Sequence, residues 1–379
     1  MDAAQYVVEP ADLWTSRVPA RHEDMAPKVV QLPEGGDAWS FEDGAWLRPL
    51  GLDVAVGHGP LDVKGLGYSY GEIRQGAYDV GQRIADMAAD EVDAAAVFPT
   101  YGMSVRTILD PDLHLACVRA YNDGVWEWAQ AGQGRLVPQG LVPCTGLDDA
   151  TQELERVVTL GYRGIVFSGW PSGGIQAAVE DDPFWAICQE SGVVVNLVQG
   201  GPSADRTPTA ARKWIGPDAA HVRADETTFE AQWVQSAGIP NVNLAYFVMS
   251  GVLDRFPRLQ VALIDAGAGW LPFTAELLDW NYRYSRYLRE YADLKYMPSD
   301  YVRRQVKATL KGERSAVEAR HDVGVGALMW HSNYPKSGSS WPQSRQAIQD
   351  LFRDVPDEER RRMAGENCAD FYGVTPVES

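Results

Sequence analysis

His331, Asn333 and Lys336 follow a short apolar segment that ends at Trp330. The segment after it, HSNYPKSGSSWPQSR, is rich in Ser, Gly and Pro, a composition typical of irregular loops. An imidazole can act as a general base near neutral pH, and an ammonium group can stabilise an anion. The spacing therefore favours the rim of an active site at the end of a strand, with a solvated turn as the simpler alternative.

The elements that position these residues are predicted from an alternation of helical and apolar segments along the chain. The sequence predicts helices over 80–92, 113–132, 147–161 and 182–192, and strands over 4–10, 93–100, 135–143, 162–169, 193–201, 258–270 and 325–333. Short strands without polar residues are typical of parallel sheets that helices cover on both faces. The alternation and its roughly eight strands predict an α/β protein, a (β/α)8 TIM barrel in one domain over residues 1–379.

Two segments interrupt this alternation. Residues 37–51 carry Asp43-Gly44 between aromatic-rich arms, which predicts a β-hairpin insertion. Residues 199–226 are long and rich in Pro and Gly, which favours a lid-like loop. No glycine-rich phosphate or dinucleotide motif follows a predicted strand, so the sequence gives no support for nucleotide binding.

The carboxyl ends of barrel strands carry the chemistry, because their loops meet on one face. We predict His331 as a general base oriented by Asp265, with Tyr6 and Lys336 donating hydrogen bonds to an oxyanion. We interpret Glu9 as structural. Packing alone is the alternative role for every one of these residues. The predicted substrate-binding residues are Tyr101, Ser168, Trp170, Asn196, Gln199, Asn333 and Trp341.

Composition limits the partners of the chain. Thirty-four Lys and Arg against 52 Asp and Glu give a net charge of −18, which disfavours nucleic acid and anionic membranes as partners. The four cysteines are far apart and are predicted to be reduced core thiols. The N-terminus lacks the pattern of a signal peptide, and no apolar run could span a membrane. We therefore expect a cytoplasmic protein with a small-molecule substrate.

Four ordered blocks resemble the amidohydrolase-2 family, the group that includes amino-carboxymuconate-semialdehyde decarboxylase and γ-resorcylate decarboxylase. The blocks begin with YVVEPADLWTSRVPARHEDMAPKVV near the N-terminus and continue over 251–279, 329–345 and 365–374. The resemblance spans nearly the whole chain. It implies a (β/α)8 barrel, in agreement with the strand count, and a dimer, either of identical chains or with a homologous subunit.

The resemblance also implies a divalent metal, usually zinc or manganese, but the expected ligand positions have changed. The first-strand ligands fall on Ala4 and Tyr6, the middle-strand histidine on Asn196 or Val198, and the last-strand aspartate on Asn333. Tyr, Val and Asn are poor substitutes for the imidazole and carboxylate ligands of such sites. Asp265 and His331 could supply two ligands at most, so we predict no metal and no other cofactor.

Three functions stay open. The first is an enzyme that performs metal-independent hydrolysis, lyase or related acid–base chemistry on an acyl, aromatic-acid or coenzyme A thioester substrate. The second is a non-catalytic subunit that pairs with a metal-competent homologue. The third is a diiron-type oxygenase acting on a coenzyme-A-linked substrate, which six scattered histidines poorly support.

Overall fold

Nine parallel strand segments form the centre of the protein. The computed structural model describes residues 1–59, 61–174, 176–200, 228–284 and 293–374. One sheet has the order β1-β5-β6 and the other the order β12-β11-β10-β9-β8-β7. Their bounds are β1 (Asp2–Val7), β5 (Ala95–Pro99), β6 (Leu136–Pro138), β7 (Gly140–Leu141), β8 (Gly164–Val166), β9 (Val194–Val198), β10 (Val261–Ile264), β11 (Val306–Leu310) and β12 (Leu328–Trp330).

The two parallel sheets are connected at both of their edges. Only Gln139 separates β6 from β7, so one extended segment contributes a strand to each sheet. At the opposite edges, the Tyr6 N–H donates to the Tyr334 carbonyl at 2.7 Å and the Asn333 N–H donates to the Ala4 carbonyl at 3.2 Å. The segment that follows β12 therefore lies beside β1.

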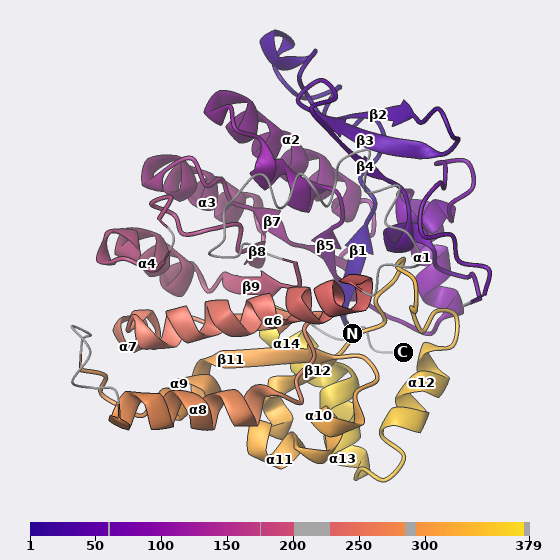
Figure 1. Ribbon diagram of the computed structural model, residues 1–379. Coiled ribbons are helices and arrows are strands. Elements are labelled where there is room, and N and C mark those ends of the chain that lie inside the picture. The colour runs from indigo at the N-terminus through magenta and orange to yellow at the C-terminus, as the bar shows by residue number, and fades with distance from the viewer. Residues whose placement is uncertain (60, 175, 201–227, 285–292, 375–379) are drawn as a thin grey trace.

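Helices surround these strands and follow them in the chain, which confirms the predicted α/β organisation (Figure 1). A polar cap fixes the start of the helix before β6, because the Asp110 carboxylate accepts a hydrogen bond from the Leu113 N–H. The helices are α1 (Val80–Ala89), α2 (Pro111–Gln130), α3 (Leu147–Leu160), α4 (Asp182–Ser191), α6 (Thr228–Met249), α7 (Val252–Arg255), α8 (Leu271–Tyr284), α9 (Pro298–Gln305), α10 (Arg314–Glu318), α11 (Arg320–Val323), α12 (Ser344–Leu351), α13 (Asp357–Arg361) and α14 (Asn367–Tyr372).

β10 packs against two apolar clusters, one on each of its faces. In β10, Ala262 and Ile264 belong to one buried cluster, whereas Val261 and Leu263 belong to another. Successive side chains of a strand point to opposite faces, so both faces of β10 are buried. This explains why the strand contains no polar residue.

A small antiparallel sheet packs at one end of the protein. Its strands are β2 (Lys28–Gln31), β3 (Asp37–Phe41) and β4 (Trp46–Pro49), in the order β2-β3-β4. Asp43 and Gly44 lie in the turn between β3 and β4 with positive φ angles of 54° and 88°. The predicted lid, 199–226, lies outside the described residues except for Gln199 and Gly200. Within the described residues, no helix is both long and apolar enough to cross a membrane.

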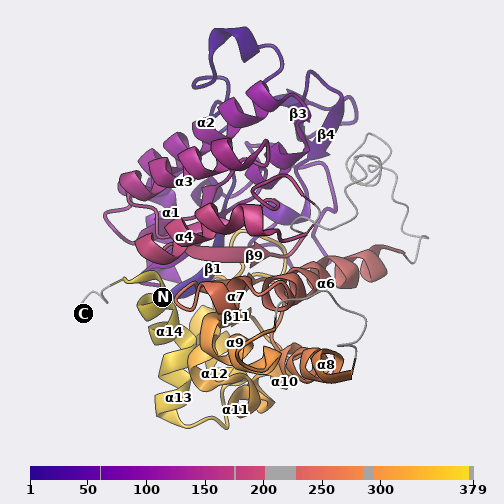
Figure 2. The ribbon, with the colours of Figure 1, turned by 90° about the vertical axis from the view of Figure 1, so that its left-hand side faces the viewer.

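α14 covers the amino end of β1. Figures 1 and 2 both show the N-terminus beside this helix. The Cys368 thiol lies 3.8 Å from the Asp2 carbonyl oxygen, and the Arg163 guanidinium donates to the Tyr372 carbonyl. The carboxyl ends of the strands are therefore the ends that α14 leaves uncovered.

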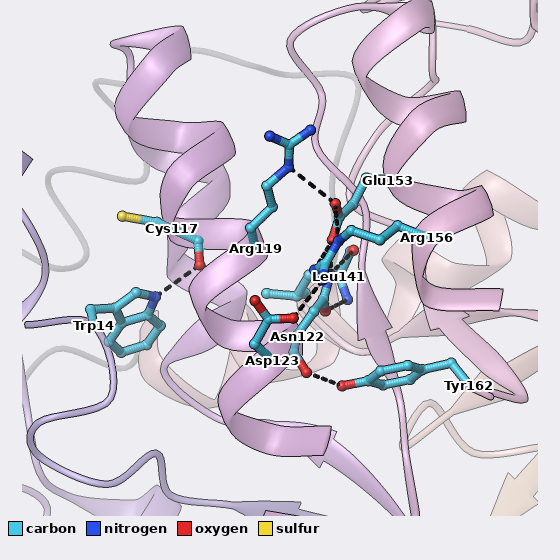
Figure 3. A network of polar contacts seen from close by, with 9 residues as sticks. All are labelled: Trp14, Cys117, Arg119, Asn122, Asp123, Leu141, Glu153, Arg156 and Tyr162. Atoms are coloured by element: carbon cyan, nitrogen blue, oxygen red, sulfur yellow. Dashed lines mark hydrogen bonds and ion pairs between the residues drawn. The ribbon is translucent and has the colours of Figure 1, made fainter. Parts of the chain in front are cut away.

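A buried carboxylate joins α2 to α3 (Figure 3). The Glu153 side chain is fully buried and accepts hydrogen bonds from Asn122 at 2.7 Å and from Arg156 at 2.7 and 2.9 Å. Arg119 lies 3.3 Å from the same carboxylate, so two guanidinium groups compensate its charge. The network fixes α2, which follows the β5 end, against its neighbour.

Glu153→Gln is expected to lower the free energy of unfolding by about 2 kcal/mol, because an amide cannot accept all of these charge-assisted hydrogen bonds. Urea denaturation measures the change. Glu127→Gln, which alters an exposed carboxylate of α2 that pairs with Arg17, is the matched control and should have little effect. Equal stability of both variants would contradict a structural role for Glu153.

Candidate active site

Asp265 is the centre of a polar cluster at the carboxyl ends of the strands. It follows β10 with a φ of 56°, and its N–H donates to the Thr309 hydroxyl at 2.8 Å. Its Oδ2 accepts a hydrogen bond from the Tyr6 hydroxyl at 3.1 Å and one from Lys336 Nζ at 3.1 Å. Left-handed backbone at a residue other than glycine is uncommon and often marks a functional position.

Lys336 contacts two members of this cluster. Its Nζ lies 3.3 Å from the centre of the Tyr6 ring as well as 3.1 Å from Asp265. The two charged side chains are only 15% and 9% exposed, so solvent screens their attraction weakly. The three residues come from the first strand, the end of β10 and the loop after β12, and the tertiary structure brings them together.

The protonation states follow from burial and charge. Burial alone would raise the pKa of Asp265, but the positive charges of Lys336 and Lys311 lower it below its usual value, so Asp265 is a carboxylate. Burial and the adjacent Asp265 raise the pKa of Tyr6 well above its usual value. The Tyr6 phenol is therefore neutral and donates a hydrogen bond to Asp265.

His331 lies beside the cluster without a hydrogen bond to it. Its Nε2 is 3.8 Å from Asp265 Oδ1, which is longer than a hydrogen bond. Burial lowers the pKa of His331, so the imidazole is neutral. Its Nδ1 is buried and has no hydrogen-bond partner among the described residues. Asp265 thus holds Lys336 and Tyr6 directly and contacts His331 only through its charge.

Asn333 is the second strand-end residue with left-handed backbone. Its φ is 67°, its side chain is buried, and its Oδ1 accepts no hydrogen bond from the part of the chain that the structure describes. The Lys336 N–H donates to the Asn333 carbonyl at 2.9 Å, which fixes the turn that leads to Lys336. Asn333 and Lys336 are therefore placed by the same loop.

Arg48 and Asp53 adjoin the cluster, and sequence reasoning did not single them out. Arg48 Nη2 donates to Asp53 Oδ2 at 2.6 Å, and its guanidinium lies 4.8 Å from the centre of the Tyr101 ring. Burial raises the pKa of Asp53, but the charges of Arg48 and Lys336 outweigh it and keep Asp53 ionised. No sequence motif marks this pair, because the packing of β4 over the strand ends places it there.

Glu9 fixes the loop after β5. Its carboxylate accepts hydrogen bonds from the N–H groups of Thr100, Tyr101 and Gly102 at 2.8 to 3.1 Å. Burial raises the pKa of Glu9 to about 7, while the three N–H donors and Arg48 favour its charged form. The arrangement supports the structural role that we assigned to Glu9.

Asn196 and Gln139 fill the space between the strands instead of joining the cluster. Asn196 Nδ2 donates to the side chain of Gln139 at 2.8 Å, and Asn196 Oδ1 accepts from the Tyr372 hydroxyl of α14 at 2.7 Å. A methyl group on Gly164 would lie 2.0 Å from Gln139 Oε1 and 2.9 Å from Asn196 Nδ2, so only glycine fits there. The polar atoms of Asn196 are thus committed to the protein interior.

The two tryptophans predicted as pocket walls also pack elsewhere. Trp170 packs within an aromatic group that includes Trp185 and Phe247. The Trp341 indole donates to the Asp86 carbonyl of α1 at 3.0 Å and lies under the Arg74 guanidinium. Both rings contribute to packing between elements, outside the group around Asp265.

The remaining predicted residues follow β5, β8 and β9. Tyr101 is buried below Arg48, and its hydroxyl has no partner within the described ranges. The Ser168 hydroxyl donates weakly to the Val166 carbonyl at 3.4 Å, and the Gln199 amide donates to the Ser236 hydroxyl at 3.0 Å. Two of the predicted substrate-binding residues contact the cluster or its neighbours: Asn333 accepts a hydrogen bond from the Lys336 N–H, and Tyr101 packs under Arg48.

A model of the amidohydrolase family matches residues 76–374. This chain belongs to that family. Its structure is similar to that of an amidohydrolase from Mycobacterium avium subsp. paratuberculosis K-10. The TM-score is 0.77, and the two sequences are 17% identical over 99% of this chain and 98% of the other chain. Comparison with curated proteins finds no match.

Two decarboxylases share this fold. 5-Carboxyvanillate decarboxylase from Sphingomonas paucimobilis has a TM-score of 0.64 and 23% identity over 79% of this chain and 84% of its own. Dihydroxybenzoic acid decarboxylase from Polaromonas sp. JS666 was solved with bound manganese and 2-nitroresorcinol. It has a TM-score of 0.64 and 16% identity over 99% of this chain and 98% of its own. At these identities the likeness shows the fold.

The cluster is a poor match to a divalent metal. Among the described residues, no group of three or more His, Cys, Asp or Glu side chains could hold a metal ion. Asp265 Oδ2 already binds the Lys336 ammonium group and accepts a hydrogen bond from the Tyr6 hydroxyl. A metal at this carboxylate would have to displace a positive charge, which like-charge repulsion opposes.

Proposed function

We propose that this amidohydrolase is a lyase-type enzyme that decarboxylates an aromatic or similarly conjugated acid without a divalent metal. In this proposal Asp265, Lys336, Tyr6 and His331 form the active site. We place the site at one mouth of a single (β/α)8 barrel, and the hydrogen bonds between β1 and the loop after β12 support this arrangement. The aromatic-acid decarboxylases that share the fold support the reaction class.

The ion pair between Asp265 and Lys336 is the observation that carries this proposal. Loss of carbon dioxide leaves an electron pair on the carbon that bore the carboxylate, and that carbon must then gain a proton. A conjugated oxygen of the substrate can take up the negative charge, and a fixed cation close to that oxygen stabilises the transition state. Lys336 supplies such a cation in a site where burial limits screening by water.

Lys336, and not Tyr6, is the donor for this charge. The ammonium group has three N–H bonds and uses one of them on Asp265, which leaves two for a substrate. The single O–H of Tyr6 is already donated to Asp265. Tyr6 therefore acts as a positioning residue, and its ring and hydroxyl hold Lys336 and Asp265 in place.

His331 is the group that we assign to proton transfer. Its imidazole is neutral and buried, and Nδ1 has no partner among the residues described. A neutral imidazole has one lone pair, so it can accept a proton from a hydroxyl group of the substrate and, as the imidazolium, deliver it to the carbon that lost carbon dioxide. The Asp265 charge 3.8 Å away stabilises the imidazolium that would form during the exchange.

The test is release of carbon dioxide from a panel of hydroxybenzoic acids that includes 5-carboxyvanillate and 2,6-dihydroxybenzoate. We expect turnover of at least one acid by protein dialysed against a chelator, and no increase when zinc or manganese is added. Activity that needs added metal would contradict the metal-free site. Inactivity on the whole panel, in protein shown to be folded, would contradict the proposed reaction.

A further inference from the structure

The outer face of α8 carries large apolar side chains that the protein leaves exposed. Four side chains are 66%, 44%, 58% and 62% exposed, in the order Phe273, Leu277, Trp280 and Tyr284. Residues three or four positions apart are neighbours on a helix, so these four form one line along α8, the α8 stripe. The rings of Trp280 and Tyr284 already pack on each other, with centroids 5.1 Å apart.

The opposite face of α8 is the face that packs within the chain. It carries the buried residues Leu271, Thr274, Ala275 and Leu278. Figures 1 and 2 both show α8 at the outer edge of the ribbon. A helix at the surface of a globular protein needs only one apolar face, and the other is normally polar. The second apolar face of α8 therefore indicates that another surface covers it.

The α8 stripe is large for the surface of a single chain. A buried aromatic side chain removes about 150–250 Å² from water, so at their exposed fractions the four side chains present roughly 450 Å² together. Monomeric proteins rarely expose a contiguous apolar patch of more than a few hundred Å². Two copies that cover each other's stripe would bury about 900 Å², more than half of the roughly 1,600 Å² of a standard interface.

One edge of the stripe carries both signs of charge. Glu276 and Arg283 are exposed and lie on the same side of α8, two turns apart. Within the described ranges, no ion pair joins either of them to another residue of the chain. A surface that meets a second copy of itself across a two-fold axis must carry both members of each contact. An edge with one carboxylate and one guanidinium fulfils this condition.

The position of these charges suits an antiparallel pair of helices. A two-fold axis that crosses α8 near Asp279 reverses the direction of the second helix and keeps the same edges together. It sets Glu276 close to Arg283 of the second copy, and the contact occurs twice. The same axis brings Leu277 close to Trp280 of the second copy, so the two stripes cover each other.

An acidic hollow lies next to this edge. It has a volume of about 100 Å³, and residues of α8, α9 and α11 line it. Its charged lining residues are Glu276, Asp279, Asp322 and Arg303, three carboxylates against one guanidinium. Such a lining favours a cation at its edge. Arg283 of a second copy, placed beside Glu276, would supply that cation.

We propose that α8 is the interface between two copies of this chain, packed antiparallel through the α8 stripe and the Glu276–Arg283 edge. The self-complementary charges identify a second copy as the occupant, because a different partner would need an apolar face with the same two charges in the reverse order. The interface does not depend on the proposed reaction, and its test does not use activity.

Sedimentation velocity of the full chain over a dilution series tests the self-association. Wild-type protein should have twice the mass of one chain. Leu277→Glu should be a monomer, because it places a charge within the apolar contact. Trp280→Ala should raise the Kd of the dimer roughly 30-fold or more, the loss expected for a tryptophan at the centre of an interface.

Leu61→Glu is the matched control for Leu277→Glu. Leu61 is 99% exposed and lies between β4 and α1, outside the stripe, so the same substitution should leave the dimer unchanged. Both altered side chains are solvent-exposed in the single chain, so circular dichroism should show an unchanged fold for both variants.

Exchange of the edge charges tests the antiparallel pairing. Arg283→Glu sets carboxylates against carboxylates, and Glu276→Arg sets guanidinium groups against each other. Each variant should therefore associate about 3–10-fold more weakly than wild-type protein, because two exposed pairs are lost in each dimer. An equimolar mixture of the two variants should recover the wild-type Kd, because each chain then presents the charges that the other needs.

A wild-type chain that stays monomeric throughout the dilution series would overturn the proposal and would leave the stripe to another kind of partner. A dimer that persists unchanged in Leu277→Glu and Trp280→Ala would place the interface elsewhere on the chain. Weaker association of both charge variants without recovery in their mixture would contradict the antiparallel arrangement.

Discussion

Lys336→Met is expected to lower kcat by roughly 10²–10³-fold, the loss that follows removal of one fixed electrostatic donor to a transition state. Methionine keeps most of the length of the side chain and removes the charge, so the Asp265 carboxylate would keep only Tyr6 as a donor among its present contacts. Initial rates of carbon dioxide release, with the most reactive acid of the panel, measure the effect. KM should change less than kcat, because the charge matters most when the carbanion develops.

Lys64→Met is the matched control for this variant. Lys64 also pairs with a carboxylate, Glu72 at 3.2 Å, and lies 5.4 Å from the centre of a tyrosine ring, Tyr68. Its side chain is 54% exposed, whereas that of Lys336 is 15% exposed, so the Lys64 pair is solvated and the Lys336 pair is mostly buried. Lys64→Met should keep full activity. A Lys336→Met protein that is folded and fully active would remove the basis of the proposed function.

His331→Gln is expected to lower kcat by about 10²–10⁴-fold, the range typical of a positioned acid–base group. Glutamine is polar and similar in size, but it cannot exchange a proton at neutral pH. Solvent deuterium should slow the wild-type enzyme more than the variant if the imidazole transfers the proton in the slow step. Rates in H2O and D2O, with both proteins, measure the difference.

His58→Gln provides the comparison for His331. His58 is exposed and packs its ring 5.4 Å from Tyr68, so it is a histidine with aromatic contact and no place in the cluster. Circular dichroism of both variants establishes whether the fold persists. Full activity of His331→Gln would leave the segment HSNYP as a structural loop, which is the simpler of the two interpretations given by its sequence.

The sequence was enough to predict the alternation of apolar strands and helices. It was also enough to predict that single strands are buried on both faces. β10 is an example: its residues are apolar on both faces, and a strand with two buried faces needs no tertiary information to be recognised. Asp265, His331 and Lys336 were predicted as site residues for a similar reason, because they follow apolar segments directly and the carboxyl ends of barrel strands carry the chemistry.

The partners of these residues were decided by the tertiary structure. Sequence alone suggested that Asp265 orients His331, whereas Asp265 holds Lys336 and Tyr6, because the loop after β12 turns at Asn333 and carries the ammonium group over the first strand. Trp341 illustrates the same limit: a tryptophan in a Ser-rich loop resembles a pocket wall, yet its indole is used to pack that loop on α1.

Arg48 and Asp53 show what a linear pattern cannot contain. Their types and spacing match no motif, since an arginine on a hairpin or in a loop is usually a solvated side chain. What sets Arg48 apart is that it donates to the Thr100 carbonyl and the Ser104 hydroxyl at the end of β5, which depends on how β4 and the loop held by Glu9 pack. Local periodicity determines strands and helices, but the charge around a side chain depends on neighbours far away in the chain, and only the folded structure specifies them.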